Sequence, residues 1–427
     1  MSRKSWLGQW NSPVASYYLI LGVTALLTAI GLAMVLSASS VRALNMGDSP
    51  YSIFLGQARF ALLGAVALCV TALIPVRFYR KGAWFILAGA MGLQLLIFSP
   101  LALSAGGNTN WVNLGFTAAQ PSEVVKLGLA IWLGAVLARK QALIGRWTHA
   151  LIPAVPVAAV AVGLVLGGND LGTAIILMMI VAGALWVAGV PGRLFAIGGS
   201  VAAVGMVALA QTDNRAKRIA AWLGENCDEQ AACYQTKHGL WALGTGGWGG
   251  VGLGAGREKW LYLPEAHNDF IFAVVGEELG LQGTLLMLVL FGVLGAAMTR
   301  VVLRHPDPFV KITTAAIAAW IIGQALVNVA VVIGLLPVIG VPLPLVSAGG
   351  SALIMTMAAI GVVVAFARDE PEARAALAAR PRTVRRSIAV VARGGARRLG
   401  RRGRARPSER TSSGSVPSVR SERVSRG

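Results

Sequence analysis

Long apolar runs separated by short polar segments dominate this chain of 427 residues. A membrane-spanning helix needs about 17–25 predominantly apolar residues, because its length must match the hydrocarbon core of a bilayer. This pattern predicts an all-α polytopic membrane protein with about ten transmembrane helices. The predicted spans are Tyr17–Ser37, Phe54–Ile74, Ala83–Leu103, Ser122–Leu137, Leu151–Leu166, Leu171–Val190, Leu194–Ala210, Phe270–Met298, Ile312–Ile333 and Ser351–Phe366.

The distribution of basic residues in the short loops predicts the orientation of these spans. Alternate loops carry arginine and lysine clusters, for example Arg77, Arg80 and Lys81 after the second span. The intervening loops are poor in basic charge, with Arg42 as an exception. Since basic loops stay on the cytoplasmic side, both termini are predicted to be cytoplasmic and residues 211–268 to form one large extracytoplasmic loop.

Composition supports this assignment and divides the chain into three parts. Hydrophobic residues make up 56% of the chain and charged residues only 13%, whereas soluble proteins carry about 25% charged residues. We expect residues 1–16 to form a cytoplasmic segment, residues 17–368 the transmembrane domain, and residues 369–427 a disordered tail. From Arg368 onward the sequence holds 17 arginines against five acidic residues and no aromatic residue.

This basic tail bears on possible partners. A low-hydrophobicity, highly charged segment is typical of disorder, and beside a membrane it attracts anionic lipid headgroups. Nucleic-acid binding is the weaker interpretation, because no aromatic side chains for base stacking are interspersed among the arginines. Docking of another protein on the tail stays open.

Acidic residues gather where the eighth span begins, in Pro264–Gly280. Charges at a membrane helix are costly unless they are paired, hydrated or functional. The positive end of the helix dipole accounts for Glu265 and in part for Asp269. It does not account for Glu277 and Glu278, which lie about two turns deeper. We therefore favour a functional interpretation of this segment.

Other polar stretches fall on the same outer side. Trp111–Lys126 contains Glu123 and Lys126, three residues apart on one helix face, and a structural ion pair and substrate contact are equally plausible there. In Asn169–Thr173 we favour a turn-capping role for Asp170. Pro337–Ser351 is a broken loop of the kind that lines cavities at membrane depth, and the Gly-rich stretch Gly239–Gly256 has the composition of a segment that dips into the outer leaflet.

The outer basic residues suggest what the cavity binds. Arginine and lysine recognise phosphate groups, so a lipid-linked anionic substrate presented at the outer face fits this side of the protein. The relevant residues are Lys126, Arg215, Lys217, Arg218, Arg257 and Lys259. Cys227 and Cys233 lie close together in the large external loop, and a disulfide is favoured over a metal site because further ligands are lacking nearby.

Several long motifs resemble those of the SEDS family (shape, elongation, division, sporulation). They occur in the family's order and read QPSEVVK, DLGT, the run from YQTKHGLWALGTGGWGG through PEAHNDFIFAVVGEELG, and PLPLVSAGGS. The resemblance covers about Tyr17 to Arg368. The sequence MVLSASSV and Leu345 are closer to division-type than to elongation-type members. Two positions depart from the family pattern: Asn268 stands in place of the usual threonine, and Asn110 in place of a common arginine.

The resemblance implies a peptidoglycan glycosyltransferase of the plasma membrane, acting at the division septum. Such an enzyme polymerises lipid II into β-1,4 glycan strands with a class B penicillin-binding protein and other division proteins. The family's essential carboxylate corresponds to Asp269, our candidate general base. The expected substrate site comprises Trp111, Glu123, Lys126, Arg218, Lys259, Glu265, His267, Ser347, Gly349 and Gly350. A divalent cation, Mg²⁺ or Mn²⁺, could help to neutralise the pyrophosphate, with ligands that the sequence does not define.

Other functions fit parts of the sequence. A transporter that flips lipid II would also need many spans and a carboxylate near the membrane. It should also need polar groups across the whole membrane, and the sequence shows no matching polar set at the cytoplasmic side. An elongation-type polymerase stays open, while a purely scaffolding protein would not explain the acidic segment.

Overall fold

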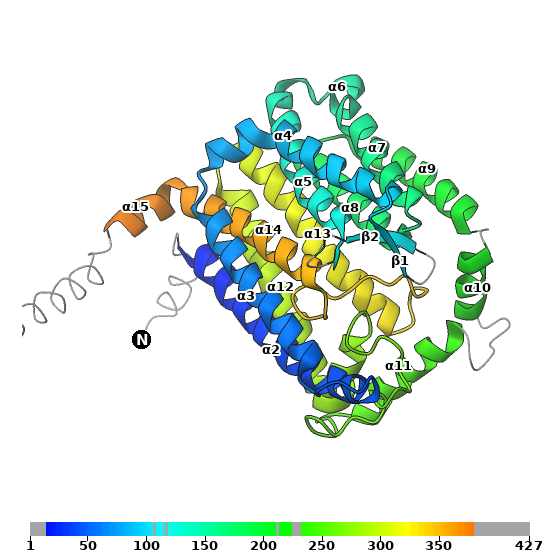
Figure 1. Ribbon diagram of the computed structural model, residues 1–427. Helices are drawn as coiled ribbons and strands as arrows, with labels where there is room; N and C mark the ends of the chain where they lie inside the picture. The colour runs from blue at the N-terminus through cyan, green and yellow to red at the C-terminus, as the bar shows by residue number, and fades with distance from the viewer. Residues whose placement is uncertain are drawn as a thin grey trace, which may run out of the picture. The chain divides into compact units, whose positions relative to one another are not determined.

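The computed structural model describes residues 14–105, 108–113, 115, 118–210, 213–223 and 232–379. Residues up to Leu377 form one compact unit, which is almost entirely helical (Figure 1). The long helices are α2 (Ala15–Asn45), α3 (Ser52–Leu73), α4 (Val76–Leu95), α5 (Pro121–Arg139), α7 (Ala154–Gly167), α8 (Leu171–Ala188), α9 (Gly192–Ala210), α12 (Ile271–Arg304), α13 (Pro308–Val332) and α14 (Gly350–Asp369). The shorter helices are η1 (Leu96–Phe98), η2 (Gln141–Leu143), α6 (Trp147–Leu151), α10 (Asp213–Trp222), α11 (Ala232–Gly246) and α15 (Pro371–Ala379).

Each of the ten predicted spans overlaps a long helix, although the third, Ala83–Leu103, was drawn too long and ends within the strand that begins at Ala102. Among the described residues, nine helical segments are long and apolar enough to cross a membrane, with α4 extended by η1 and α7 preceded by α6. The remaining predicted span, the seventh (Leu194–Ala210), corresponds to α9, whose described apolar stretch Gly192–Gly205 falls short of that length. The polytopic all-α prediction is therefore confirmed.

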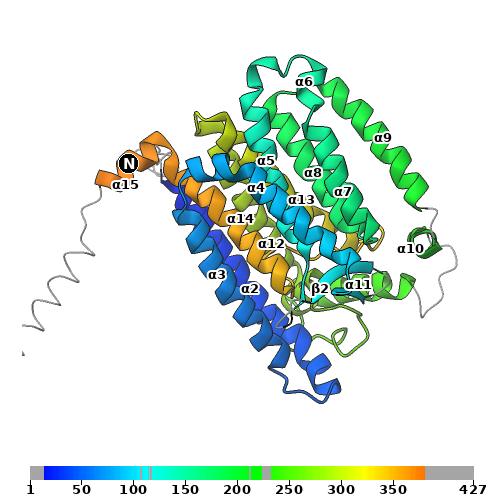
Figure 2. The same ribbon diagram turned by 45° about the horizontal axis from the view of Figure 1, so that its top comes forward.

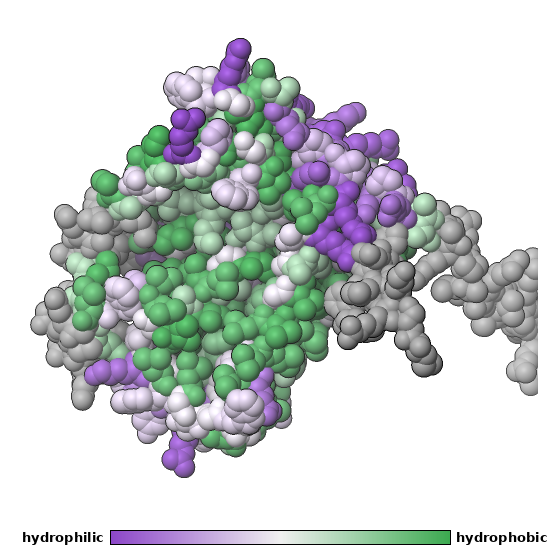
Figure 3. Space-filling model, turned by 180° about the vertical axis from the view of Figure 1, so that it is seen from behind, coloured by the Kyte–Doolittle hydropathy of each residue, from purple (hydrophilic) through white to green (hydrophobic). Residues whose placement is uncertain are grey.

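Large apolar side chains cover the outside of the bundle. Leu62, Phe85, Val201 and Leu303 are all more than two-thirds exposed, which fits contact with lipid tails rather than water. Figure 3 shows the result as a broad hydrophobic band with hydrophilic side chains gathered toward its two ends. Cys69 lies on the exposed face of α3 as a free thiol.

The centre of the bundle is formed by α5 and α13. In the most apolar stretch of α5, 89% of the residues are buried, because this helix is apolar on all sides and neighbours surround it. Trp132 on α5 and Trp320 on α13 are fully buried. Figure 2 shows α2 and α3 on one side of this centre and α7 and α9 on the other.

The connections at the outer end contain more structure than the sequence predicted. A small antiparallel sheet, in the order β1 (Ala102–Ala105), β2 (Asn108–Asn113) and β3 (Ala118–Ala119), precedes α5. The large loop contains α10 and α11. At the other end of the chain, α15 occupies the first part of the tail that we expected to be disordered, and residues 380–427 lie outside the described part.

Candidate active site

The acidic segment that precedes α12, residues 263–270, is tied to the loop that precedes α14, residues 335–349. The buried hydroxyl of Ser347 donates a hydrogen bond of 2.6 Å to the carbonyl of Asn268. The same hydroxyl accepts one of 2.8 Å from the amide of Leu343. Ser347 was expected at the substrate site, and it positions the backbone next to Asp269.

A buried side chain on α13 fixes the same two segments. The amide nitrogen of Asn328 donates to the carbonyl oxygen of Asp269 at 2.7 Å and to that of Val341 at 2.8 Å. Buried polar groups of this kind are stabilising only when they find partners. Two other parts of the chain, α13 and the loop before α14, therefore hold the backbone at Asp269 in place.

Asp269 itself is a buried carboxylate without a complete set of partners. The residue is 9% exposed, and no described residue donates a hydrogen bond to its buried Oδ1. Burial, followed by the charge of Glu265, raises the pKa of Asp269 to about 7, although its own backbone amide and Arg218 act in the opposite direction. A carboxyl group with a pKa near the working pH can accept a proton and release it again.

Glu265 differs from Asp269 because it is paired. Its Oε1 lies 3.1 Å from Nη1 of Arg42, at the end of α2. Its Oε2 accepts a hydrogen bond of 3.1 Å from Asn268. Burial acts to raise the pKa of Glu265, but these hydrogen bonds and the charges of His267 and Arg42 hold it below its ordinary value. Glu265 is therefore the ionised neighbour of Asp269.

His267 lies between the two carboxylates along the chain. Its carbonyl accepts a hydrogen bond of 2.9 Å from the amide of Ala348. Burial lowers the pKa of His267 and Arg42 adds to this effect, while Glu265 opposes it. The imidazole is thus neutral near pH 7 and available as a hydrogen-bond donor or acceptor.

Arg218 on α10 brings a positive charge to the site. It is exposed, and its Nη1 donates to the carbonyl of Val338 at 3.3 Å. Its charge lowers the pKa of Asp269. Trp222 on the same helix donates to the carbonyl of Gly334 at 2.9 Å, so α10 is attached to the loop before α14.

Lys126 and Glu123 form a buried ion pair at the beginning of α5. Their closest charged atoms are 2.7 Å apart, and the side chains are 2% and 3% exposed. Lys126 also donates to Gln324 at 3.1 Å and lies over the ring of Trp320. This geometry matches the paired-charge structural alternative, because the ammonium group already has its partners.

Lys259 is similarly engaged. Its ammonium nitrogen lies 2.7 Å from Oε1 of Glu278 and 2.9 Å from the hydroxyl of Ser37 on α2. The side chains of Lys259 and Glu278 are 3% and 0% exposed. In this arrangement the ammonium group of Lys259 already has two partners, and a role in binding a substrate phosphate stays a prediction.

Glu277 also holds the external loop. Its Oε1 accepts hydrogen bonds from the backbone amides of Arg257 at 2.6 Å and Glu258 at 3.3 Å. Together with the Glu278 ion pair, this contact fixes residues 257–259 against α12. The four acidic residues therefore have two different roles. Glu277 and Glu278 anchor the external loop, whereas Glu265 and Asp269 lie at the candidate site.

The Gly-rich stretch packs into a break in α12. Gly280 has a φ of 67° inside the helix, and a side chain there would meet the backbone of Gly250, which has a φ of 81°. The backbone groups of α12 that the break leaves without helical partners form hydrogen bonds with the Gly-rich stretch. The amide of Val251 donates to the carbonyl of Glu277 at 3.0 Å, and the amide of Leu281 donates to the carbonyl of Gly247 at 2.9 Å. Irregular backbone is thus buried against protein, as we expected at membrane depth.

The remaining predicted site residues lie on the elements around this centre. Trp111 is half-buried on β2, opposite Leu103. The amide of Gly349 donates to Oε1 of Gln57 at 3.1 Å, and Gly350 begins α14. These contacts give the two glycines a backbone role at the helix start.

Asp170 caps α8, as the sequence indicated. Its Oδ1 accepts from the amide of Thr173 at 2.9 Å. Its Oδ2 accepts from Asn110 at 3.1 Å and Gln120 at 3.0 Å. Asn110, which we left out of the site, thus joins the sheet to the cap of α8.

The cysteine prediction concerns the large loop. Cys233 is disulfide-bonded, while Cys69 is free. The predicted partner, Cys227, lies outside the described residues.

Sequence reasoning missed several contributors to the site, above all Arg42, Ser37, Gln57 and Asn328. Arg42 was noted only as an exception in a loop poor in basic residues. That exception was the available signal, because an isolated cation on the outer side calls for an anionic partner. The other three are common polar residues within apolar spans, and nothing in the sequence distinguishes them.

The inner, cytoplasmic end of the bundle contains more polar contacts than the sequence predicted. We expected no polar set there, but Arg80 pairs with Asp307, and Asp369 pairs with Arg374 and faces His305. These groups largely neutralise one another, as structural ion pairs do.

A protein-held metal centre does not fit the described residues. They contain no group of three or more His, Cys, Asp or Glu side chains that could hold an ion, and Glu265 is already engaged by Arg42 and Asn268. The divalent cation stays a prediction that would require ligands from substrate phosphates.

Curated relatives resemble the chain over most of its length. It is 41% identical over 377 residues to "Probable peptidoglycan glycosyltransferase FtsW" of Mycobacterium tuberculosis, covering 88% of this chain and 71% of the relative. The protein of the same name from Hahella chejuensis is 35% identical over 352 residues, covering 81% and 88%.

Solved structures agree with the fold. The chain matches a structure described as "Structural coordination of polymerization and crosslinking by a peptidoglycan synthase complex", with a TM-score of 0.66, 25% identity and coverage of 82% and 97%. It matches the rod shape determining protein RodA of Thermus thermophilus with a TM-score of 0.62, 26% identity and coverage of 83% and 97%. A family model described as "Cell cycle protein" for FtsW, RodA and SpoVE matches residues 17–372. The chain therefore belongs to this family, that of the SEDS proteins whose motifs it carries.

Proposed function

We propose that this chain is a division-type peptidoglycan glycosyltransferase that polymerises lipid II at its outer face, with Asp269 as the general base. The relatives named FtsW support the enzyme class and the division type. The observation that carries the mechanism is the buried Asp269 carboxylate, whose Oδ1 has no described hydrogen-bond donor and whose pKa is raised to about 7 by burial.

The proposed reaction inverts the anomeric carbon of the donor sugar. The 4-hydroxyl oxygen of the acceptor sugar attacks that carbon from the face opposite the pyrophosphate. As the new C–O bond forms, the hydroxyl proton passes to the carboxylate of Asp269. The bond between the anomeric carbon and the pyrophosphate oxygen breaks, and the polyprenyl pyrophosphate leaves with the electron pair.

The surrounding residues would orient the base and stabilise the leaving group. Asn328 binds the carbonyl oxygen of Asp269 and Ser347 binds that of Asn268, so together they limit the movement of the carboxylate. The exposed Arg218 guanidinium is suited to the pyrophosphate, because guanidinium groups bind phosphate through two parallel hydrogen bonds. Lys126 and Lys259 are less suited, since both already form buried ion pairs.

The partner and the location belong to the same proposal. A solved neighbour is described as a peptidoglycan synthase complex that coordinates polymerisation and crosslinking. By similarity, we propose that a class B penicillin-binding protein crosslinks the strands made by this chain, at the division septum and together with other division proteins. The multi-pass membrane fold is consistent with both.

The side from which lipid II is supplied tests polymerase against flippase. In proteoliposomes with the protein oriented one way, lipid II in the outer-equivalent leaflet should be converted to glycan, and the Asp269→Ala variant should not convert it. Lipid II restricted to the inner leaflet should stay unpolymerised, because its pyrophosphate headgroup needs polar groups along the whole route to cross the hydrocarbon. Exchange between leaflets by the protein alone, unaffected by Asp269→Ala, would favour transport instead.

A further inference from the structure

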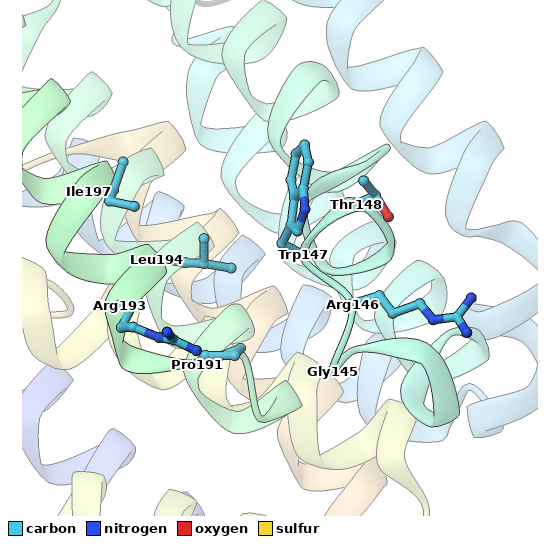
Figure 4. Close-up of a pocket in the computed structure, with 8 residues that line it drawn as sticks. All are labelled: Gly145, Arg146, Trp147, Thr148, Pro191, Arg193, Leu194 and Ile197. Atoms are coloured by element: carbon cyan, nitrogen blue, oxygen red, sulfur yellow. The ribbon is translucent and has the colours of Figure 1, made fainter.

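A cavity opens at the opposite end of the bundle from Asp269, where the chain around α6 meets the beginning of α9. It has a volume of about 550 Å³ and is lined by Arg146, Trp147, Thr148, Arg193, Leu194 and Ile197, among others (Figure 4). The basic loops on this side place it at the cytoplasmic surface of the membrane. The proposed polymerisation does not use this cavity.

The cavity carries positive charge that is not neutralised. No acidic residue lines it, and within the described part of the chain no acidic side chain pairs with Arg146 or Arg193. Figure 4 shows the Arg193 side chain running toward Pro191, while Arg146 points away from α9. Both arginines line the cavity and are exposed, so neither guanidinium group is held in place by a buried partner.

The other wall of the cavity is apolar and continues along α9. Leu194 points across the cavity toward Trp147 (Figure 4). Ile197, Val201 and Val204, spaced four and three residues apart on one helix face, are 61%, 68% and 71% exposed. This strip leads from the cavity toward the middle of the membrane, which is the path that an acyl chain would follow.

An aromatic side chain marks the level of the membrane surface. Trp147 is 63% exposed beside the two arginines, and tryptophan is enriched where lipid headgroups meet the hydrocarbon. Basic pockets between transmembrane helices on the cytoplasmic side are suited to anionic headgroups. A free phosphate would use the arginines but not the strip on α9.

We propose that this cavity binds an anionic phospholipid of the inner leaflet. Its phosphate lies between Arg146 and Arg193, the hydroxyl of Thr148 is available as a further donor, and one acyl chain follows Ile197 along α9. The residues of this site are distinct from those of the basic tail, for which we predicted attraction to anionic lipid from composition alone.

Native mass spectrometry of the full-length protein, titrated with phosphatidylglycerol, tests the proposal. The double variant Arg146→Ala/Arg193→Ala should bind its first phosphatidylglycerol about thirtyfold more weakly, because each basic residue contributes about 1 kcal/mol. Arg77→Ala/Lys81→Ala is the matched control, since it removes two exposed basic residues from the cytoplasmic end of α4. Its affinity should stay within about twofold of wild type, because neither residue lines the cavity. Equal weakening in both double variants would mean diffuse attraction and would overturn the proposal.

Two further probes separate the lipid from other sources of phosphate. Phosphatidylcholine, which has the same chains but no net charge, should not occupy the site in the wild-type protein. Inorganic phosphate in large molar excess should leave phosphatidylglycerol bound, because it lacks the contact with α9. Displacement by inorganic phosphate, or equal binding of phosphatidylcholine, would contradict an anionic-lipid site.

Discussion

Asp269 and Glu278 are both buried carboxylates near the outer end of α12, but their surroundings are opposite. Glu278 accepts hydrogen bonds from Lys259 at 2.7 Å and from Ser37 at 2.6 Å. The Oδ1 of Asp269 has no described donor, although the residue is only 9% exposed. The first carboxylate is compensated in the folded protein, and the second is not.

This difference indicates that Asp269, rather than Glu278, is the candidate catalytic carboxylate. A buried charge with close partners holds two parts of a fold together, here the external loop and α2 against α12. A buried carboxyl without partners has a raised pKa and destabilises the fold when ionised. Such a group is a candidate for function, because stability alone would favour its replacement.

Breaking the Glu278 pair should have the largest effect on stability. Lys259→Met leaves Glu278 buried and unpaired, which costs about 3–5 kcal/mol. Thermal unfolding in detergent should show a large drop in the midpoint, and adding Glu278→Gln to the same chain should restore much of it. An unchanged midpoint with loss of polymerisation would instead make Lys259 a substrate residue.

The break in α12 offers the next largest effect. Gly280→Ala forces a side chain onto a residue with a φ of 67° and against the backbone of Gly250, at a cost of about 1–3 kcal/mol. Gly292→Ala is the control on the same helix, because a side chain there meets nothing within 4 Å. Thermal unfolding should separate the two variants. Equal midpoints would show that the Gly-rich stretch does not pack into α12 as described.

A smaller effect is expected at Arg218. Its charge lowers the pKa of Asp269, so Arg218→Ala should move the acidic limb of the pH–rate profile upward by a few tenths of a unit. The Michaelis constant for lipid II should also rise if Arg218 binds the pyrophosphate. Lys237→Ala, which removes an exposed cation from α11, should change neither quantity. A downward shift in the Arg218 variant would contradict the electrostatic assignment.

The spans, and the position of Asp269 just before the eighth of them, could be predicted from the sequence because each depends on a local pattern. Apolar runs set the helices, and the NDFIF motif placed Asp269 at the start of the eighth span. Glu123 and Lys126 were also readable as a pair, because they are three residues apart on one helix.

The pairing of distant residues could not be predicted. Arg42 and Glu265 are 223 positions apart, and Ser37 and Glu278 are 241 apart. Only the packing of α2 against α12 brings them together, so no local pattern signals either contact. For the same reason, the sequence did not reveal that Lys259 was already paired with Glu278.

The central claim is that Asp269 is a base whose pKa lies near 7, and the pH dependence of polymerisation tests it most directly. Because the carboxyl group must be ionised, kcat/KM of the wild type should fall about tenfold for each pH unit below about 7. Asp269→Asn should lower activity by about 10²–10⁴-fold and remove this acidic limb.

Unfolding of the same two proteins controls for structure. The folded-state pKa of Asp269 is raised above its ordinary value of 3.8 to about 7, so its ionised form costs stability as pH rises through about 7. Asp269→Asn should therefore be at least as stable as the wild type at pH 8. Lost polymerisation with retained stability is the predicted result. A variant that keeps more than about a percent of the activity, or that keeps the acidic limb in full, would contradict the assignment of Asp269 as the general base.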